Sequence, residues 1–274
     1  MTDGLRGNSH ELMQKMADIR GYKVVKSNDL IQRSRFQLSM QEQKIVLYLI
    51  SKITPEDMEL KEHTFEIIDF CKVCGLETNS GANYKYIKQT LKDLRDKSIW
   101  ITLESGAETT ISWLDKVTLE NRSGTVILKI GDDMKPYLLQ LKERFTQYEL
   151  LYTLAMRSQY SIRLYELLKS YEYKHRKTFD IHELKQLLSA DNYTRFPDFK
   201  RKVLDIALRE LNDLSDLTVT YEIIKEGRRY AKIEFSMRVK KELKERLKTL
   251  ARIDEVINPA QQSLFDKIYP YKPE

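Results

Sequence analysis

The sequence contains few of the residues on which several protein classes depend. Its 274 residues include two cysteines, six prolines and nine glycines. Two cysteines cannot form a disulfide framework, and so little proline and glycine excludes a fibrous or low-complexity chain. The longest apolar run covers residues 45–50, far short of the roughly 18 to 20 residues that cross a bilayer. We therefore expect a globular cytoplasmic protein without a membrane-spanning segment.

Sequence signatures of common enzyme classes are also missing. The chain has no Gly-x-x-x-x-Gly-Lys-Ser/Thr loop for nucleoside triphosphates and no glycine-rich dinucleotide fingerprint. Cys71 and Cys74 have no second pair of ligands beside them, and a structural zinc ion needs four. Pro197 and Asp198 suit the first turn of a helix better than a nuclease site. We expect no catalytic residue, no metal and no cofactor, and hence no enzyme.

The charge of the chain is basic and unevenly distributed. There are 47 Lys and Arg against 41 Asp and Glu, a net charge of +6. Residues 225–252 hold eleven of the basic and four of the acidic residues, a local net of +7, so the rest of the chain sums to −1. Such a concentration is typical of a surface that binds phosphate backbones. The alternative is that Lys240, Lys241, Lys244, Arg246 and Lys248 only solubilise a terminal helix.

One series of elements occurs twice along the chain. The peptide Thr-Phe-Glu-Ile at residues 64–67 returns as Thr-Phe-Asp-Ile at residues 178–181. A strongly apolar helix precedes each copy, at residues 39–53 and 160–171. After each peptide we expect a short helix (68–75 and 182–189), a long amphipathic helix (83–97 and 197–213), a strand (99–104 and 217–222) and a hairpin with its turn at 121–124 or 225–228.

This order of elements is that of a winged helix-turn-helix. We therefore predict an α+β, mostly helical fold with tandem winged helix-turn-helix domains related by internal duplication.

The long helix of the first copy has one apolar and one basic side. At 100° per residue, Tyr86, Ile87, Leu91 and Leu94 share a buried stripe. A helix of this kind can enter the major groove of DNA, where Lys and Arg reach guanine and Gln reaches adenine. The predicted DNA-binding residues of this helix are Lys85, Lys88, Gln89 and Lys92.

The long helix of the second copy has a mixed outer side. Its inward positions are Phe199, Val203, Ala207, Leu211 and Leu214, and Lys200 falls on the same side. Its outward positions are Arg201, Lys202, Asp205, Arg209 and Asn212. Of these we expect Arg201, Lys202 and Arg209 to contact DNA, together with Arg228 and Arg229 at the tip of the following hairpin. The alternative for either helix alone is that its charges only face water, and recurrence in two copies argues against it.

The sequence resembles the replication initiator proteins of iteron-containing, theta-replicating plasmids. The resemblance covers about residues 22–240. It starts from Val-Val-Lys-Ser-Asn-Asp-Leu at residues 24–30 and Phe-Gln-Leu-Ser at residues 36–39. In the second copy it is carried by Phe-Pro-Asp-Phe-Lys-Arg-Lys-Val-Leu at residues 196–204 and Lys-Ile-Glu-Phe at residues 232–235.

The resemblance implies a function for the protein and a separate role for each of its two domains. Such a protein binds direct repeats at a plasmid origin as double-stranded DNA, helps to open the adjacent duplex and recruits the host initiator and helicase. Family members also form a homodimer, largely through the first domain, that represses their own gene. The main specific contacts usually come from the second recognition helix, which gives weight to Lys200, Arg201 and Lys202.

The expected organisation follows from the pattern and the resemblance together. We expect an N-terminal arm (1–21), poorly ordered or helical; a first winged-helix domain (22–140) for dimerisation and DNA contact; a second winged-helix domain (145–240) as the main DNA-binding unit; a basic C-terminal helix (241–253); and a flexible tail (254–274).

The tail contains a peptide similar to the motif by which bacterial replication proteins bind the sliding clamp. It reads Gln261, Gln262, Ser263, Leu264 and Phe265, with an apolar pair that suits a pocket. The motif residues are Gln261, Ser263, Leu264 and Phe265, while Gln262 replaces the favoured Leu. The alternative is that Leu264 and Phe265 pack on the second domain.

Two other functions stay open at this point. A transcriptional regulator with tandem winged helices and no replication role would show the same DNA-binding surface. A scaffold protein would use the basic region for solubility alone.

Overall fold

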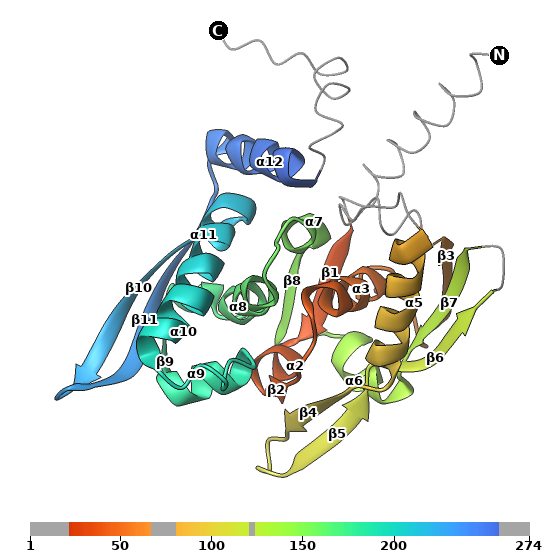
Figure 1. Ribbon diagram of the computed structural model, residues 1–274, viewed down its shortest axis with the longest axis horizontal. Coiled ribbons are helices and arrows are strands. Elements are labelled where there is room, and N and C mark those ends of the chain that lie inside the picture. The colour runs from red at the N-terminus through yellow and green to blue at the C-terminus, as the bar shows by residue number, and fades with distance from the viewer. Residues whose placement is uncertain (1–21, 67–80, 121–123, 258–274) are drawn as a thin grey trace, which may run out of the picture.

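The computed structural model describes residues 22–66, 81–120 and 124–257. Two winged halves lie side by side, each with its wing at an outer end of the molecule (Figure 1). Between them lie α3 (Met40–Ile50), α8 (Gln159–Lys169) and β1 (Lys23–Ser27), which pairs antiparallel with β8 (Phe145–Glu149). β1 begins the first half and β8 comes near its end. This pairing therefore brings the beginning and the end of the first half together.

The two halves contain the following further elements. The first half has α2 (Asn28–Gln32), β2 (Ser34–Arg35), β3 (Glu62–Glu66), α5 (Gly81–Arg95), β4 (Ser98–Thr102), β5 (Glu108–Ser112), β6 (Leu114–Leu119), β7 (Thr125–Ile130), η1 (Asp132–Met134), α6 (Lys135–Leu138) and α7 (Leu150–Leu154). The second half has η2 (Glu172–Lys174), β9 (Arg176–Asp180), α9 (Ile181–Leu187), α10 (Phe196–Phe199), η3 (Lys200–Leu204), α11 (Asp205–Leu214), β10 (Leu217–Glu226), β11 (Arg229–Val239) and α12 (Leu243–Ile257).

Side chains in the sequence define where several helices start. Ser39 and Glu42 form a capping box at the start of α3, in which each side chain bonds the other residue's backbone. Ser158 caps α8, and Asp180 accepts from two backbone N–H groups of α9. Pro197 lies in the first turn of α10, where its missing N–H costs nothing. Within the described residues, the expected helices begin within one or two residues of their predicted positions.

The winged sheets of the two halves have the same strand order. In the first half the order is β3-β7-β6, and in the second half it is β9-β11-β10. In each sheet the strand before the long helix pairs with the last strand of the wing. Both wings are the hairpins expected from the sequence, although the tip of the first wing, residues 121–123, lies outside the described residues.

The strand after the long helix differs between the halves. The sequence pattern matched residues 99–104 with residues 217–222. In the structure β10 is part of the second wing, whereas β4 pairs with β2 and β5 in a separate sheet. The first half therefore contains an extra hairpin between its long helix and its wing. The turn of this hairpin includes Gly106 with φ +85°, a conformation that glycine adopts easily.

The second long helix is not a regular α-helix. Its residues Lys200–Leu204 form a π-helical turn between α10 and α11. A π turn inserts one extra residue into the helical repeat and is often found at functional sites. Residues on its two sides therefore depart from the 100° spacing that the sequence pattern assumed.

The C-terminal helix α12 is longer than expected. The sequence pattern ended it at residue 253, but Ile253 and Ile257 are both buried and extend it to Ile257. In the described ranges, no helix has the length and apolarity that a membrane crossing requires.

The buried core extends through both halves. Its largest fully buried side chains are Trp113 in the first half and Tyr165, Phe179, Phe199 and Phe235 in the second. Phe179 of β9 and Phe235 of β11 meet edge to face, with centroids 6.1 Å apart. This contact packs two paired strands of the second winged sheet against each other on its buried face.

Candidate nucleic-acid interface

The first long helix, α5, presents the expected basic side. Lys85, Lys88, Gln89 and Lys92 are all exposed, and Ile87, Leu91 and Leu94 are buried. The exposed side is less purely basic than expected, because the Gln89 amide donates to Asp93 at 2.7 Å. Contact between these residues and DNA stays a prediction.

Two contacts fix α5 relative to the rest of its half. The Nε of Arg95 donates to the carbonyl of Asp115 in β6, at 3.1 Å. Just after the helix, Lys97 donates to both carboxylate oxygens of Glu42, each at 2.7 Å. Because Glu42 also caps α3, the first long helix is tied to its wing on one side and to α3 on the other.

The second long helix exposes three of its expected cations. Arg201, Lys202 and Arg209 are exposed, while Phe199, Val203, Ala207 and Leu211 are buried. The Arg201 side chain is 74% exposed, and its guanidinium lies 3.6 Å from the Asp198 carboxylate. At this exposure such a pair is weak, so Arg201 remains available to a ligand.

Lys200 is not on the apolar side of the helix, so that assignment was wrong. Its Nζ donates to both oxygens of Asp205, at 2.8 and 2.9 Å. A spacing of five residues brings the two side chains together because the helix has a π turn there. The Tyr221 hydroxyl of β10 also donates to Asp205, at 3.1 Å. The hydrogen bond with Asp205 raises the pKa of Lys200, so its charge is already balanced within the protein.

Asn212 was predicted on the outward side and is turned inward instead. Its side chain accepts from the backbone N–H of Val219 at 2.7 Å and donates to the carbonyl of the same residue at 3.0 Å. These two hydrogen bonds engage both ends of the amide with β10. Asn212 therefore holds the long helix to the wing.

The second wing ends in the two expected arginines. Gly227 has φ +63° and forms the turn, after which Arg228 and Arg229 are exposed. Arg229 donates to Glu226 at 2.9 Å across the turn. Behind the tip, the ring of Tyr230 stacks on Phe196 at the start of the long helix, with centroids 4.3 Å apart.

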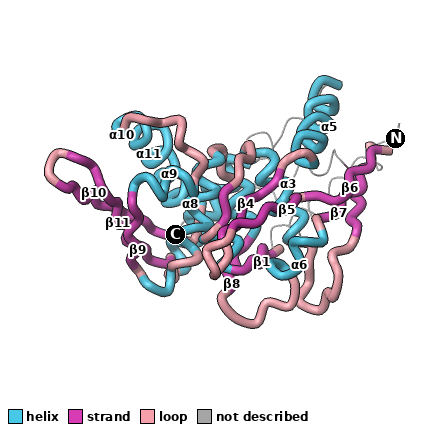
Figure 2. Tube along the Cα trace, turned by 90° about the horizontal axis from the view of Figure 1, so that it is seen from below, coloured by secondary structure: helices cyan, strands magenta, loops and turns pink. Residues whose placement is uncertain are grey.

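The two long helices lie on one side of the molecule. Figure 2 shows α5 at one end and α10 and α11 at the other, both on the upper side of the view, with the two wings beyond them. Figure 1 shows the wings at opposite ends. A basic helix and a wing are therefore repeated along one long face.

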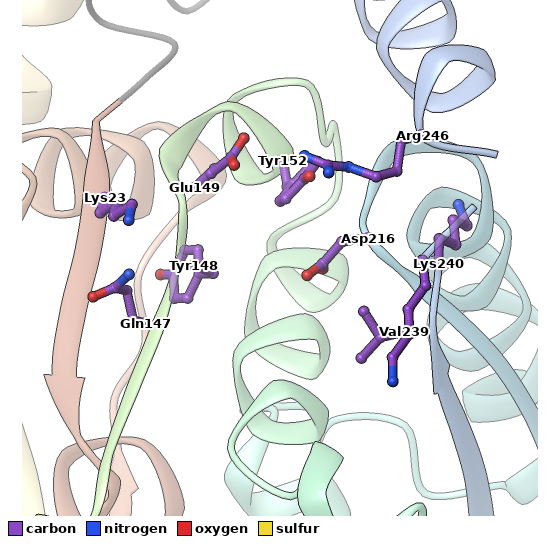
Figure 3. A pocket seen from close by; sticks show the side chains of 10 residues that line it. Lys23, Gln147, Tyr148, Glu149, Tyr152, Asp216, Val239, Lys240 and Arg246 are labelled. Atoms are coloured by element: carbon purple, nitrogen blue, oxygen red, sulfur yellow. The ribbon is translucent and has the colours of Figure 1, made fainter. Parts of the chain in front are cut away.

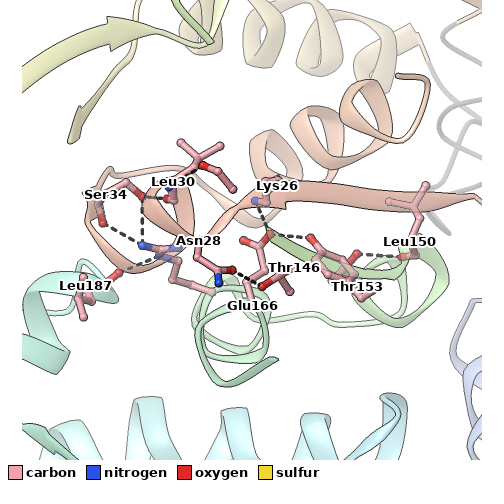
Figure 4. A network of polar contacts seen from close by, with 12 residues as sticks. Lys26, Asn28, Leu30, Ser34, Thr146, Leu150, Thr153, Glu166 and Leu187 are labelled. Carbon is pink, nitrogen blue, oxygen red and sulfur yellow. Dashed lines mark hydrogen bonds and ion pairs between the residues drawn. The ribbon is translucent and has the colours of Figure 1, made fainter. Parts of the chain in front are cut away.

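A buried polar cluster joins the two halves (Figure 4). Glu166 of α8 forms an ion pair with Lys26 of β1 and accepts from the Tyr148 hydroxyl of β8 at 2.5 Å. Arg163, one turn earlier, donates to the carbonyl of Ser34 in the first half at 2.8 Å and to that of Leu187 in the second at 3.0 Å. Through α8, charged hydrogen bonds thus connect the two halves within the shared core.

Burial shifts the pKa values of this cluster. It lowers the pKa of Lys26 and lowers that of Arg163 to about 10, and it raises the pKa of Tyr148 well above its usual value. The sequence reasoning did not select these residues. The available signal was a pair of charges, Arg163 and Glu166, three residues apart on the apolar helix 160–171.

The basic region 225–252 is divided among several structural roles. Lys240 is buried and donates to the Ser215 carbonyl at 2.8 Å and to the Thr249 hydroxyl at 3.0 Å, and burial lowers its pKa. Arg238 pairs with Glu245 at 2.7 Å. The expected continuous basic patch is therefore split, because part of its charge stabilises the junction between α11, β11 and α12.

A cavity of about 390 Å³ lies between the two halves, away from the predicted DNA-binding residues (Figure 3). Lys23, Glu149 and Tyr152 line it from the first half, and Asp216, Lys241 and Arg246 line it from the second. In the described ranges, no cluster of three or more His, Cys, Asp or Glu side chains is arranged to hold a metal ion.

Several sequence predictions fall outside the described residues. These are the N-terminal arm (1–21), the short helix at 68–75 with Cys71 and Cys74, and the clamp-like motif Gln261, Ser263, Leu264 and Phe265.

Two family models match the chain. The model described as Initiator Replication protein, WH1, matches residues 23–169, and the model described as Initiator Rep protein, WH2, matches residues 180–237. The first match alone covers more than half of the 274 residues.

Three curated proteins of Escherichia coli are similar to the chain. A replication initiation protein is 27% identical over 217 residues, which are 75% of this chain and 66% of that protein. A PI protein is 28% identical over 150 residues, which are 48% of this chain and 49% of that protein. An uncharacterized 27.6 kDa protein is 22% identical over 225 residues, 75% of this chain and 91% of that protein. The chain thus spans less than two thirds of the length of the first two relatives.

Proposed function

The chain belongs to the family of plasmid replication initiator proteins, as its sequence predicted, and from that premise we propose that it binds direct repeats at a plasmid origin and starts replication there. In this proposal it acts on double-stranded DNA in the cytoplasm, performs no covalent chemistry and needs no cofactor. The observation that carries the proposal is the repetition of an exposed basic helix and a wing along one face of the molecule.

The proposed binding mode places each long helix in a major groove. Two helices on one face of a duplex enter successive grooves about 10 to 10.5 base pairs apart, which gives a site of about 20 base pairs. Arg201, Lys202 and Arg209 read base edges in one groove. Lys85, Lys88, Gln89 and Lys92 contact the other, and Arg228 and Arg229 bind phosphates or the minor groove beside the second wing. Lys200 acts by positioning the helix through Asp205.

The finer steps of initiation are also proposals. The bound protein helps to open the adjacent duplex and recruits the host initiator and helicase. A homodimer formed through the first domain represses the protein's own gene. The motif Gln261, Ser263, Leu264 and Phe265 binds the sliding clamp as a peptide in a groove.

We further propose that the two winged halves derive from one ancestral domain. The shared strand order β3-β7-β6 and β9-β11-β10 supports this origin. The β4–β5 hairpin is then an insertion in the first copy.

A transcriptional regulator with the same DNA-binding surface is the competing function. The deciding experiment supplies the chain in trans to a plasmid that carries the DNA beside its gene and no other origin. We expect replication with the native chain and less replication with the Arg201→Ala variant. Binding to the repeats by gel shift without any replication would favour the regulator, and equal binding to random duplex would favour a scaffold.

A further inference from the structure

Helix α12 carries an apolar stripe that faces solvent. Leu243 is 71% exposed and Leu247 is 50% exposed, one helical turn apart, and Ala251 continues the row on the next turn. The adjoining side of the helix is anchored, because Thr249, Ile253 and Ile257 are buried. The apolar surface of the helix is therefore wider than the part that packs on the protein, and Leu243 and Leu247 lie on its uncovered part.

Cations flank this stripe. Lys244 and Lys248 lie beside the two leucines on the exposed side, and Lys241 and Arg246 lie near the start of the helix. In the described part of the chain, no carboxylate forms an ion pair with these four side chains, whereas Arg252 pairs with Glu255. The stripe is thus an apolar strip with unbalanced positive charge at its edges.

The position of α12 separates it from the DNA-binding face. It follows the second wing and lies beyond residue 237, where the match to the family model ends. Figure 1 shows it on the opposite side of the second half from the tip of the wing β10–β11. The stripe is therefore an addition to the winged-helix unit and not a part of its recognition helix.

We propose that the exposed face of α12 is a docking site for an acidic amphipathic helix of a partner protein. Leucines at i and i+4 fit the apolar side of such a helix, and Lys244 and Lys248 fit its acidic edges. Duplex DNA would use the lysines but leave Leu243 and Leu247 in water. A second copy of the chain would set the same cations against each other, and like charges in an interface are unfavourable. This surface goes beyond the proposed DNA-binding function and does not depend on it.

The neighbouring cavity extends the positive surface. Arg246 and Lys241 line its α12 side, and Lys23 faces them from β1 (Figure 3). An acidic side chain from a partner docked on α12 can enter there, with Glu149 and Asp216 as unfavourable neighbours, of which Asp216 is already paired with Lys169. The charge requirement on the partner is thus the same for the stripe and for the cavity.

The test measures binding of the full chain to a fluorescent synthetic helix with leucines at i, i+3, i+4 and i+7 and glutamates elsewhere. We expect binding by fluorescence anisotropy that weakens about tenfold or more in the Leu243→Ala, Leu247→Ala double variant, because the apolar contact is lost. Lys244→Gln with Lys248→Gln should weaken binding most at low salt. Met58→Ala is the matched control, because Met58 is also 71% exposed but lies in the first half.

Several results would overturn the proposal. If a scrambled peptide of the same composition binds equally well, the contact depends on charge alone and not on an amphipathic helix. Unchanged affinity in the double leucine variant would exclude the stripe. Leucine-dependent binding to phosphatidylserine vesicles without binding to the peptide would assign the face to a membrane, and self-association lost in the double variant would assign it to a second copy. DNA binding by the same variants, measured in parallel, should stay unchanged.

Discussion

The ring of Tyr230 on the second wing stacks on the ring of Phe196, with centroids 4.3 Å apart and planes 21° apart. Phe196 is the first residue of α10, so this contact joins the wing directly to the start of the recognition helix. The Lys225 ammonium lies over the Tyr230 ring, 4.8 Å from its centroid. The wing and the helix are therefore presented to a ligand as one unit.

Breaking this stack should loosen the DNA-binding surface without unfolding the protein. We expect Tyr230→Ala to lower the free energy of unfolding by about 0.5 to 1.5 kcal/mol beyond the loss of buried area, as measured by urea denaturation. Specific DNA affinity by gel shift should fall as well. Tyr230→Phe keeps the ring and serves as the control; if it weakens binding as much as Tyr230→Ala, the stack is not the cause.

Arg201 and Lys200 should contribute unequally to sequence recognition. Arg201→Ala should weaken binding to the repeats by about 1 to 3 kcal/mol and relax the preference over random duplex. Lys200→Ala should change the free energy of binding to the repeats by about 0.5 kcal/mol or less, because Asp205 already balances the charge of Lys200. Titration of both variants against repeat and random DNA measures the difference. Equal losses would mean that the pair with Asp205 opens on binding.

The basic side of α5 should be visible in the salt dependence of binding. Replacing Lys85, Lys88 and Lys92 by Gln should reduce the slope of log K against log salt by about 1 for each lysine that contacts a phosphate. The measurement is a series of affinities between low and physiological salt. Lys61→Gln, which removes an exposed lysine paired with Asp57, should leave the slope unchanged.

The buried pair of Lys26 and Glu166 should matter strongly for stability. Glu166→Ala leaves a buried ammonium without its partner, and we expect a loss of about 3 to 5 kcal/mol in the free energy of unfolding. Glu143→Ala removes an exposed carboxylate and should cost about 0.5 kcal/mol or less. Comparable losses in the two variants would show that the buried pair contributes little to stability.

Two buried tyrosines should resist ionisation. Burial raises the pKa of Tyr148 and of Tyr165 well above the usual value of about 10. The folded state then holds these protons above pH 10 while the unfolded state releases them, so their contribution to stability is complete below about pH 10 and is lost as the pH rises further. Tyrosinate absorbance should show a late step that coincides with unfolding and shrinks in Tyr148→Phe. Ionisation of every tyrosine before any loss of structure would contradict this.

Much of the fold followed from local sequence signals. Helices α3, α8 and α11 were predicted from their apolar periodicity, and the turn of the second wing was predicted at Gly227. Each of these signals is contained in a few neighbouring residues. The β4–β5 hairpin was missed because the repeat was aligned by order along the chain, and strand pairing is decided by contacts between distant residues. The sequence of a single strand does not determine which other strand it pairs with.

The candidate site was predictable where the helix is regular. Lys88, Lys92 and Arg209 are exposed as the 3.6-residue period requires. Lys200 deviates because a π turn changes that period, and Asn212 deviates because its amide satisfies the backbone of Val219. Both exceptions depend on tertiary contacts with β10, which helical periodicity does not contain.

The central claim is that both long helices hold one duplex from one face. A hydroxyl-radical footprint of the protein on a single direct repeat from beside its gene tests it most directly. We expect two protected regions about 10 to 10.5 base pairs apart on the same face of the DNA. Arg201→Ala should reduce the protection of one region, and the Lys88→Ala, Lys92→Ala double variant should reduce the protection of the other. A single protected region that is insensitive to changes in α5, or two regions on opposite faces, would contradict the account.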